Sequence, residues 1–340
     1  MTGTAIARGA TVGAEAPISS SAAGARRVSV VIPARNEAAG LGRTLAALFA
    51  DSPPGIELEV LVVDDGSTDE TAAVASGAGA RVLRPRPGDP GGSPGAARNR
   101  GAAAATGDPL IFLDADCAPA PGWLAALLAA HDAGEVVVGG ALEAPPGLPA
   151  TGRCDHYCGS YHLHPARPAG YVPNHTPANL SVRREAFLAT GGFAERSPVA
   201  DGHEELQWQA QLARRGVRIR FEPAAVVHHH NRVGIGNLLR RSWRWGYSAI
   251  QGKAETGAGR WPWLYRHPAL LIAASLPLAG VHTVHTIAAW ARHGKFEPVA
   301  MLPLIAASRL AYAAGMATGG VRWLRGRDGA RDGARRFRRR

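Results

Sequence analysis

The first 120 residues alternate between short apolar runs and amphipathic stretches. Between the first two runs, Leu41, Leu45, Leu48 and Phe49 recur at the spacing of one helix face. The apolar runs are short enough for buried strands and cover residues 28–32, 58–63, 81–83 and 110–113. This alternation predicts an α/β fold, a doubly wound mixed sheet flanked by helices and joined by right-handed crossovers.

Polar clusters follow three of these apolar runs. They cover residues 33–37, 64–65 and 114–116, each directly after a predicted strand. Ligands of open α/β sheets bind outside the carboxyl ends of the strands. The placement of the clusters therefore predicts a binding site at that edge of the sheet.

Two common nucleotide-binding motifs are missing from these positions. A dinucleotide-binding sheet needs Gly-x-Gly-x-x-Gly after its first strand, but the first strand here runs into Pro33-Ala34-Arg35-Asn36-Glu37. The chain has no Walker loop either. These observations exclude a Rossmann dehydrogenase and a P-loop enzyme.

The last quarter of the chain has a different pattern. Residues 268–290 hold no charged side chain, and residues 298–321 hold only Arg309. Each stretch has the length of a membrane-spanning helix, about 20 residues. We expect a hydrophobic hairpin over residues 267–321 that spans the membrane. Interfacial helices, or two buried helices of a soluble domain, would give a similar pattern.

Charge is distributed very unevenly. The net charge is +11, yet residues 1–239 carry 20 Lys and Arg against 23 Asp and Glu, while residues 240–340 carry 18 against 4. A net positive charge that is confined to residues 240–340 favours membrane lipids as partners and argues against nucleic acid. The positive-inside rule then places the α/β domain on the cytoplasmic face of the cell membrane.

Composition adds three further expectations. Residues 233–266 mix Arg with Trp and Tyr, which is typical of an amphipathic interfacial segment. Residues 1–26 and 322–340 are expected to be a disordered leader and a disordered basic tail. Three cysteines are too few for a disulfide scaffold.

The motifs in order resemble those of the family 2 glycosyltransferases, enzymes with a Rossmann-like GT-A fold. The resemblance covers residues 27–232, with a nucleotide-sugar half at 27–120 and an acceptor half at 121–232. The matching segments are Val28 to Glu37, Val62 to Asp69, Ala97 to Gly101, Phe112 to Asp116, Asn179 to Ser181 and Gly191 to Phe193.

Asp114 and Asp116 stand two apart at a strand end, where a turn can aim both carboxylates at one cation. Hard carboxylate oxygens suit Mn²⁺ or Mg²⁺, which would act as a Lewis acid on the donor diphosphate. The resemblance implies that Asp116 is the direct metal ligand and that Asp114 faces the ribose. The other expected donor-binding residues are Pro33, Arg35, Glu37, Asp64, Asp65 and Arg98. A helix-capping turn at Asp64 and a surface role for Arg98 are the simpler alternatives.

The second half is expected to supply a general base. In this family an acidic pair opens a helix that ends in Leu, three residues and Gly, here Leu212 to Gly216. At this spacing Glu205 stands where the family usually has an aspartate, and Glu204 or Asp201 could substitute for it as the base. An acidic first helical turn would place the same residues there without catalysis. Some relatives use a histidine after the last strand as a further metal ligand. We expect His228 to fill that role, although a solvated histidine is an equal alternative.

A second group lies between the two half-sites. Cys154, His156, Cys158, His162 and His164 could hold zinc, but their aromatic neighbours favour an acceptor-binding segment.

The sequence predicts a metal-dependent, inverting glycosyltransferase that moves one sugar from a nucleotide-sugar, with UDP favoured, to an acceptor hydroxyl. The expected acceptor is a lipid, a glycan or a small molecule, with lipid or lipid-linked acceptors favoured by the hairpin. The alternative is an inactive glycosyltransferase-like binding or scaffold protein. Too few apolar segments are present for a processive polymer synthase. A nucleotidyltransferase would need a Gly-rich loop followed by basic residues after the first strand.

Overall fold

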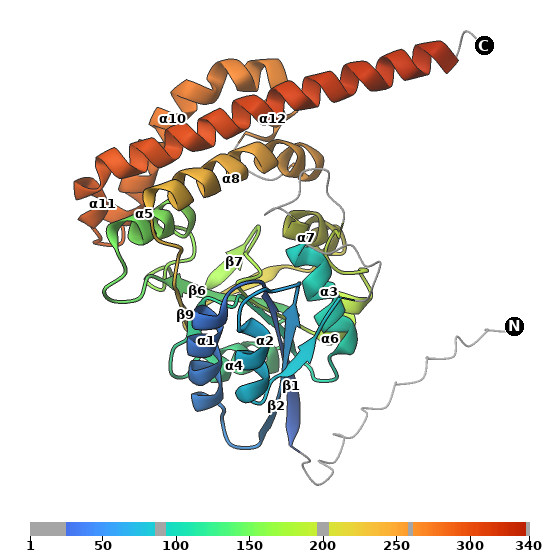
Figure 1. The fold of residues 1–340 in the computed structure, drawn as a ribbon, viewed down its shortest axis with the longest axis vertical. Helices are drawn as coiled ribbons and strands as arrows, with labels where there is room; N and C mark the ends of the chain where they lie inside the picture. Colours follow the sequence, from blue (N-terminus) through green and yellow to red (C-terminus); the bar gives the residue numbers. More distant parts are fainter. Residues whose placement is uncertain (1–24, 86–92, 196–203, 258–260, 338–340) are drawn as a thin grey trace, which may run out of the picture.

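The computed structural model describes residues 25–85, 93–195, 204–257 and 261–337 (Figure 1). One nine-stranded mixed sheet forms the centre, and its strand order is β3-β2-β1-β4-β8-β6-β9-β5, with β7 paired to β9. Figure 1 shows the C-terminal helices lying together across one end of this α/β body. The predicted α/β sheet with flanking helices is confirmed.

The parallel part of the sheet contains the four strands that the apolar runs predict. They are β1 (Arg26–Ala34), β2 (Ile56–Asp64), β3 (Arg81–Leu83) and β4 (Leu110–Leu113), and the helices between them are α1 (Ala38–Ala50), α2 (Thr71–Gly77) and α3 (Pro94–Ala104). β1 continues through Pro33 to Ala34, which pairs with Asp64 at the end of β2. The carboxyl ends of β1 and β2 therefore meet at one edge of the sheet.

The rest of the sheet is mixed. β8 pairs antiparallel with both β4 and β6, β9 runs parallel to β6, and both β5 and β7 pair antiparallel with β9. The remaining elements up to β9 are β5 (Cys117–Pro119), α4 (Trp123–Asp132), β6 (Val137–Glu143), α5 (Ala150–Gly159), β7 (Gly170–Val172), β8 (Asn179–Val182), α6 (Arg184–Leu188), α7 (Glu204–Arg214) and β9 (Ile219–His229).

Asn179, the first residue of one sequence motif, holds the centre of this mixed region together. Its amide nitrogen donates to the carbonyl oxygens of Ala141 and Ala225, both at 2.9 Å, and its side-chain oxygen accepts from the indole N–H of Trp123 at 2.8 Å. Because all these groups are buried, an apolar residue at 179 would leave several of them without partners. The motif residue therefore has a structural role.

The cysteine and histidine group does not form a zinc site. Cys154 and Cys158 are buried on α5 against the C-terminal helices, and the ring of His156 packs 5.3 Å from that of Trp290. Within the described residues, the His, Cys, Asp and Glu side chains close enough to share one ion are Asp116, Cys117 and His229. The group instead joins the α/β body to the C-terminal helices.

The C-terminal part consists of α8 (Ile235–Thr256), α9 (Pro262–Tyr265), α10 (Pro268–Ala291), α11 (Glu297–Ala300) and α12 (Leu302–Phe337). α12 packs along both α8 and α10. Among the described helices, α10 alone is long and apolar enough to cross a membrane, which is weak evidence for spanning.

The prediction for the C-terminal tail can be compared with the structure, whereas the prediction for the N-terminal leader falls mostly outside the described residues. The expected leader lies almost entirely outside the described residues, and β1 already begins at Arg26. The expected disordered tail is wrong up to Phe337, because α12 continues through it as helix. Ala and Arg are both good helix formers, so a helix that is already formed can extend through this composition.

Candidate active site

The first polar cluster forms a tight turn at the carboxyl edge of the sheet. Asn36 adopts the left-handed conformation with φ of 52°, its side-chain oxygen accepts from the backbone N–H of Thr68 at 2.8 Å, and its own N–H donates to the hydroxyl of Ser67 at 2.9 Å. Asn is one of the few residues that tolerate this conformation. The turn after β1 is thus fixed to the turn after β2.

The acidic residues after β2 have basic neighbours. Asp64 is buried, accepts a hydrogen bond from the backbone N–H of Ser67 at 2.9 Å and lies 3.8 Å from the guanidinium of Arg84. Asp65 lies 3.9 Å from Arg35. Asp64 thus closes a local turn but does not cap α2, which begins at Thr71 with Glu70 as its N-cap residue and no side-chain cap hydrogen bond. Arg35 and Asp65 line the cavity described below, together with Pro33.

Glu37 pairs with a residue from the other end of the sheet domain. Its carboxylate lies 3.3 Å from Arg232 in the loop after β9. Burial and the negative charge of Asp116 raise the pKa of Glu37, against the opposing charge of Arg232. Arg232 was not expected at the site, and the sequence carries no signal that would bring it back to the first cluster.

Arg98 on α3 links the two halves of the site. Its guanidinium lies 2.7 Å from Asp114, at the end of β4, and 3.0 Å from Glu204, at the start of the described part of α7. The Arg98 side chain is only 6% exposed, so it is not a surface arginine. These ion pairs hold Asp114 and Glu204 on either side of one buried cation.

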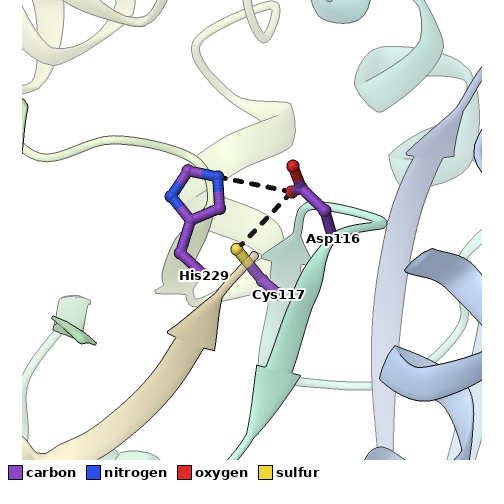
Figure 2. A group of neighbouring side chains, drawn as sticks. All are labelled: Asp116, Cys117 and His229. Carbon is purple, nitrogen blue, oxygen red and sulfur yellow. Dashed lines mark hydrogen bonds and ion pairs between the residues drawn. The ribbon is translucent and has the colours of Figure 1, made fainter. Parts of the chain in front are cut away.

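Asp116 lies against the last strand of the sheet (Figure 2). Its carboxylate is 3.4 Å from Nε2 of His229 on β9 and 3.9 Å from Sγ of Cys117 on β5, and the three ligand atoms lie within 4.8 Å of one another. Burial raises the pKa of Asp116, but the charge and hydrogen bond of His229 outweigh burial and lower it to about 2.

The structure brings His229, and not the predicted His228, next to Asp116. His228 and His229 follow each other on β9, and successive side chains of a strand point to opposite faces. His229 is the residue brought to Asp116, whereas His228 pairs in register with Ala118 and Glu143. The spacing of three consecutive histidines does not reveal which face of the strand meets the aspartate.

Asp116 and His229 fit a divalent metal ion. A carboxylate oxygen and an imidazole nitrogen are both common metal ligands, and Nε2 of His229 faces the carboxylate of Asp116 at 3.4 Å. Cys117 fits less well, since burial raises the pKa of its thiol and keeps it protonated. Asp116 and His229 are thus the side chains that could hold Mn²⁺.

Glu205 differs electrostatically from its neighbour Glu204. Burial and the negative charge of Glu204 raise the pKa of Glu205 to about 8. Glu204 instead forms the ion pair with Arg98. Glu205 is therefore the carboxyl that can take up a proton near neutral pH. The third candidate base, Asp201, lies outside the described residues.

One cavity of about 1890 Å³ is lined by most of these groups, but Asp64 is not among its lining residues. Its walls include residues from the first polar cluster, the aspartates after β4, both glutamates of α7, and side chains of α8, α10 and α12. The expected site residues that line it are Pro33, Arg35, Glu37, Asp65, Arg98, Asp114, Asp116, Glu204 and Glu205.

The mixed sheet, its flanking helices and the polar residues at its carboxyl edge form a GT-A-like fold. The chain belongs to glycosyltransferase family 2, and the model of that family, described as glycosyl transferase family 2, matches residues 29–191. Glycosyltransferase AglE of Haloferax volcanii is 30% identical over 229 residues, which are 66% of this chain and 73% of that protein.

Two further proteins show the extent of the similarity. Pre-mycofactocin glycosyltransferase of Mycobacterium tuberculosis is 35% identical over 260 residues, and the match covers 72% of this chain but only 48% of that relative. The mannosyltransferase PcManGT from Pyrobaculum calidifontis, whose structure contains GDP-Man and Mn²⁺, has a TM-score of 0.54 at 21% identity. That match covers 86% of each chain and supports the fold.

Proposed function

We propose that the chain is a metal-dependent, inverting glycosyltransferase that moves one sugar from a nucleotide-sugar to an acceptor hydroxyl. The observation that carries the proposal is the single cavity that holds Asp116 and His229 together with Glu205. A donor with its diphosphate near Asp116 and an acceptor near Glu205 would therefore share one enclosed space.

The donor would be held by the clusters at the carboxyl edge of the sheet. Asp64 and Glu37 can accept hydrogen bonds from base and ribose, and Asp114, fixed by Arg98, would face the ribose. Asp116 and His229 would hold Mn²⁺, which when bound neutralises the charge of the departing diphosphate. PcManGT, whose structure contains Mn²⁺, has a similar fold and supports this choice of ion.

Glu205 is the general base in this mechanism. Inversion requires one displacement, in which the acceptor oxygen attacks the anomeric carbon as a base removes the hydroxyl proton. A pKa of about 8 makes the ionised Glu205 a stronger base than an ordinary glutamate, and that ionised form becomes abundant as the pH approaches 8. Glu204 cannot serve as easily, because its carboxylate is engaged by Arg98.

The test is nucleotide release from UDP-, GDP- and dTDP-sugars by the full chain in a neutral detergent, with Mn²⁺ or with a chelator. We expect metal-dependent release from one donor and its loss in Asp116→Asn. Asp132→Asn is the matched control, because Asp132 pairs with Arg26 on the surface with 61% of its side chain exposed. Donor binding without release in the presence of candidate acceptors would favour an inactive binding protein, and no donor binding would refute the proposal.

We also propose that the C-terminal helices hold the enzyme at the cytoplasmic face of the cell membrane, so that a lipid or lipid-linked acceptor reaches the cavity. α10 exposes large apolar side chains, among them Leu276 at 66% and Val284 at 67%. Contiguous exposed apolar surface of this kind is typical of a membrane or protein contact.

Vesicle flotation tests this second proposal. The full chain with Leu276→Glu and Val284→Glu should no longer float with anionic vesicles, because the charges would have to enter the bilayer. Leu188→Glu on α6 is the matched control, since Leu188 is an exposed apolar residue of the α/β body. Equal flotation of all variants would contradict the contact through α10.

A further inference from the structure

The C-terminal helices contribute a part of the cavity wall that has no role in the proposed donor and base sites. This part comes from three of the helices, with Lys253 on α8, His282 and His285 on α10, and Arg309 and Tyr312 on α12. Figure 1 shows these helices stacked over the α/β body. Residues far apart in the sequence therefore enclose one chamber, which we call the helical chamber.

The α/β body contributes both acids and bases to the cavity, whereas the described residues of the C-terminal helices contribute only bases. The lining carboxylates all belong to the α/β body and are Glu37, Asp65, Asp114, Asp116, Asp155, Glu204 and Glu205. Among the lining residues that the structure describes, helices α8 to α12 contribute no acid, and their charged residues are Arg240, Arg241, Arg244, Lys253 and Arg309. Arg241 is neutralised by Asp155 at 2.5 Å. Lys253 and Arg309 have no carboxylate partner among the described residues.

Lys253 has only aromatic partners among the described residues. Its ammonium lies 3.4 Å from the hydroxyl of Tyr265 and 3.3 Å from that of Tyr312, and it sits 5.0 Å from the ring centroid of Tyr265. These contacts fix the ammonium without neutralising it. A charge held inside a protein without a counter-ion is costly, and an incoming anion would remove that cost.

Arg309 is held in a similar way. One guanidinium nitrogen donates to the carbonyl oxygen of Cys158 at 2.7 Å and to the hydroxyl of Thr286 at 2.6 Å, both neutral acceptors. Nε of Arg309 is buried and has no hydrogen-bond partner within the described part of the chain. The guanidinium is thus positioned by its neighbours and still has an N–H to offer.

We propose that Lys253 and Arg309 bind an anionic oxygen group of the acceptor, a phosphate or a carboxylate, inside the helical chamber. The inference rests on the proposed glycosyl transfer, and it specifies the chemical class of the acceptor. Charge-assisted hydrogen bonds to the anion would fix the acceptor with its hydroxyl toward Glu205. The rings of Tyr265 and Tyr312 offer an apolar surface to the body of the acceptor.

The donor diphosphate is a poorer candidate for this part of the cavity. No hydrogen bond or ion pair of the described residues joins Lys253 or Arg309 to Asp114 or Asp116, where the donor is proposed to bind. Lys253 and Arg309 belong to α8 and α12, two of the C-terminal helices. Competition between nucleotide and anion is therefore part of the test.

Binding of simple anions tests the inference without any turnover. The full chain in a neutral maltoside detergent is titrated with phenyl phosphate, benzoate and decyl phosphate, with phenol and decanol as neutral counterparts, and no donor or metal is present. We expect the anions to bind and Lys253→Met or Arg309→Met to raise Kd about tenfold or more, the effect of losing one charge-assisted hydrogen bond. Stronger binding of decyl phosphate identifies a lipid phosphate, and equal binding of phenyl phosphate or benzoate identifies a soluble anion.

Matched controls separate this role from a structural one. Lys295→Met and Arg292→Met remove exposed cations of the same types outside the cavity and should leave Kd unchanged. Lys253→Arg keeps the charge and should retain binding even if Lys253→Met folds poorly. The inference is overturned if neutral probes bind as well as anions, if the variants and controls have equal Kd, or if UDP or GDP displaces the anion. Because no donor is present, failure of this test leaves the proposed transfer reaction untouched.

Discussion

The raised pKa of Glu205 makes the pH dependence of sugar transfer a direct test of its role as the base. A base acts only after it has lost its proton, so a pKa of about 8 moves the active form to alkaline pH. The ionised fraction is about one hundredth at pH 6, about one tenth at pH 7 and about one half at pH 8. We therefore expect kcat to rise about 50-fold between pH 6 and pH 8.

The assay is initial-rate product formation with saturating donor, acceptor and Mn²⁺ across this range. Glu205→Gln should abolish transfer at every pH. Glu204→Gln should move the rising limb to lower pH, because it removes the negative charge that raises the pKa of Glu205. The same substitution removes the ion pair between Glu204 and Arg98, and the positive charge of Arg98 also lowers the pKa of Glu205.

A second readout does not depend on activity. A glutamate with a raised pKa in the folded state is stabilising while protonated, and the folded protein loses that stability as pH rises from its ordinary pKa toward 8. Glu205→Gln should therefore melt at a higher temperature than the parent above pH 8. Glu57→Gln, an exposed change at the far end of β2, should alter neither readout. A flat rate profile between pH 6 and pH 8, with no change in Glu204→Gln, would refute the assignment of Glu205.

Three further predictions concern single side chains. Arg98→Met should lower the free energy of unfolding by about 3 kcal/mol, because it leaves two facing carboxylates without their buried cation; urea unfolding measures this. His229→Ala should weaken Mn²⁺ binding about tenfold or more in calorimetry, whereas His228→Ala should not. Gly315→Ala should lower the melting temperature, since its Cβ would collide with the backbone of α8, whereas Gly280→Ala meets open space and should raise it.

Each of these predictions has an outcome that contradicts it. Unchanged unfolding of Arg98→Met would mean that water replaces the guanidinium and that the ion pairs contribute little. Equal Mn²⁺ affinity in the two histidine variants would place the ion away from β9. A stabilised Gly315→Ala would show that α8 and α12 can separate without cost.

The sequence predicts the parallel half of the fold well because its signals are local. Each apolar run before residue 114 becomes a strand, and Pro33, Asp64 and Asp114 then lie at strand ends, where chain direction alone brings them to one edge. No long-range information is needed for this step. The same reasoning places Asp116 correctly, since it follows β4 by only a few residues.

Contacts between distant segments are what the sequence does not reveal. The choice between His228 and His229 depends on the register of β9 against β5, where Cys117 stands opposite His229. Arg232 meets Glu37 across 195 positions, with no repeat or motif to indicate the pair. Because side chains alternate along β9, His228 and His230 share one face of the strand and His229 lies on the other. Alternation alone does not tell which face meets Asp116.

Arg98 couples Asp114 electrostatically to the two glutamates at the start of α7. Asp114 lies at the end of β4 and Glu204 at the start of α7, and the guanidinium of Arg98 pairs with both. Because the pairing keeps Glu204 occupied, its charge stays beside Glu205 and raises the pKa of that base. Arg98 thereby connects the geometry of the donor side to the proton affinity of the acceptor side. A change that moved Asp114 would be expected to alter the base through this guanidinium.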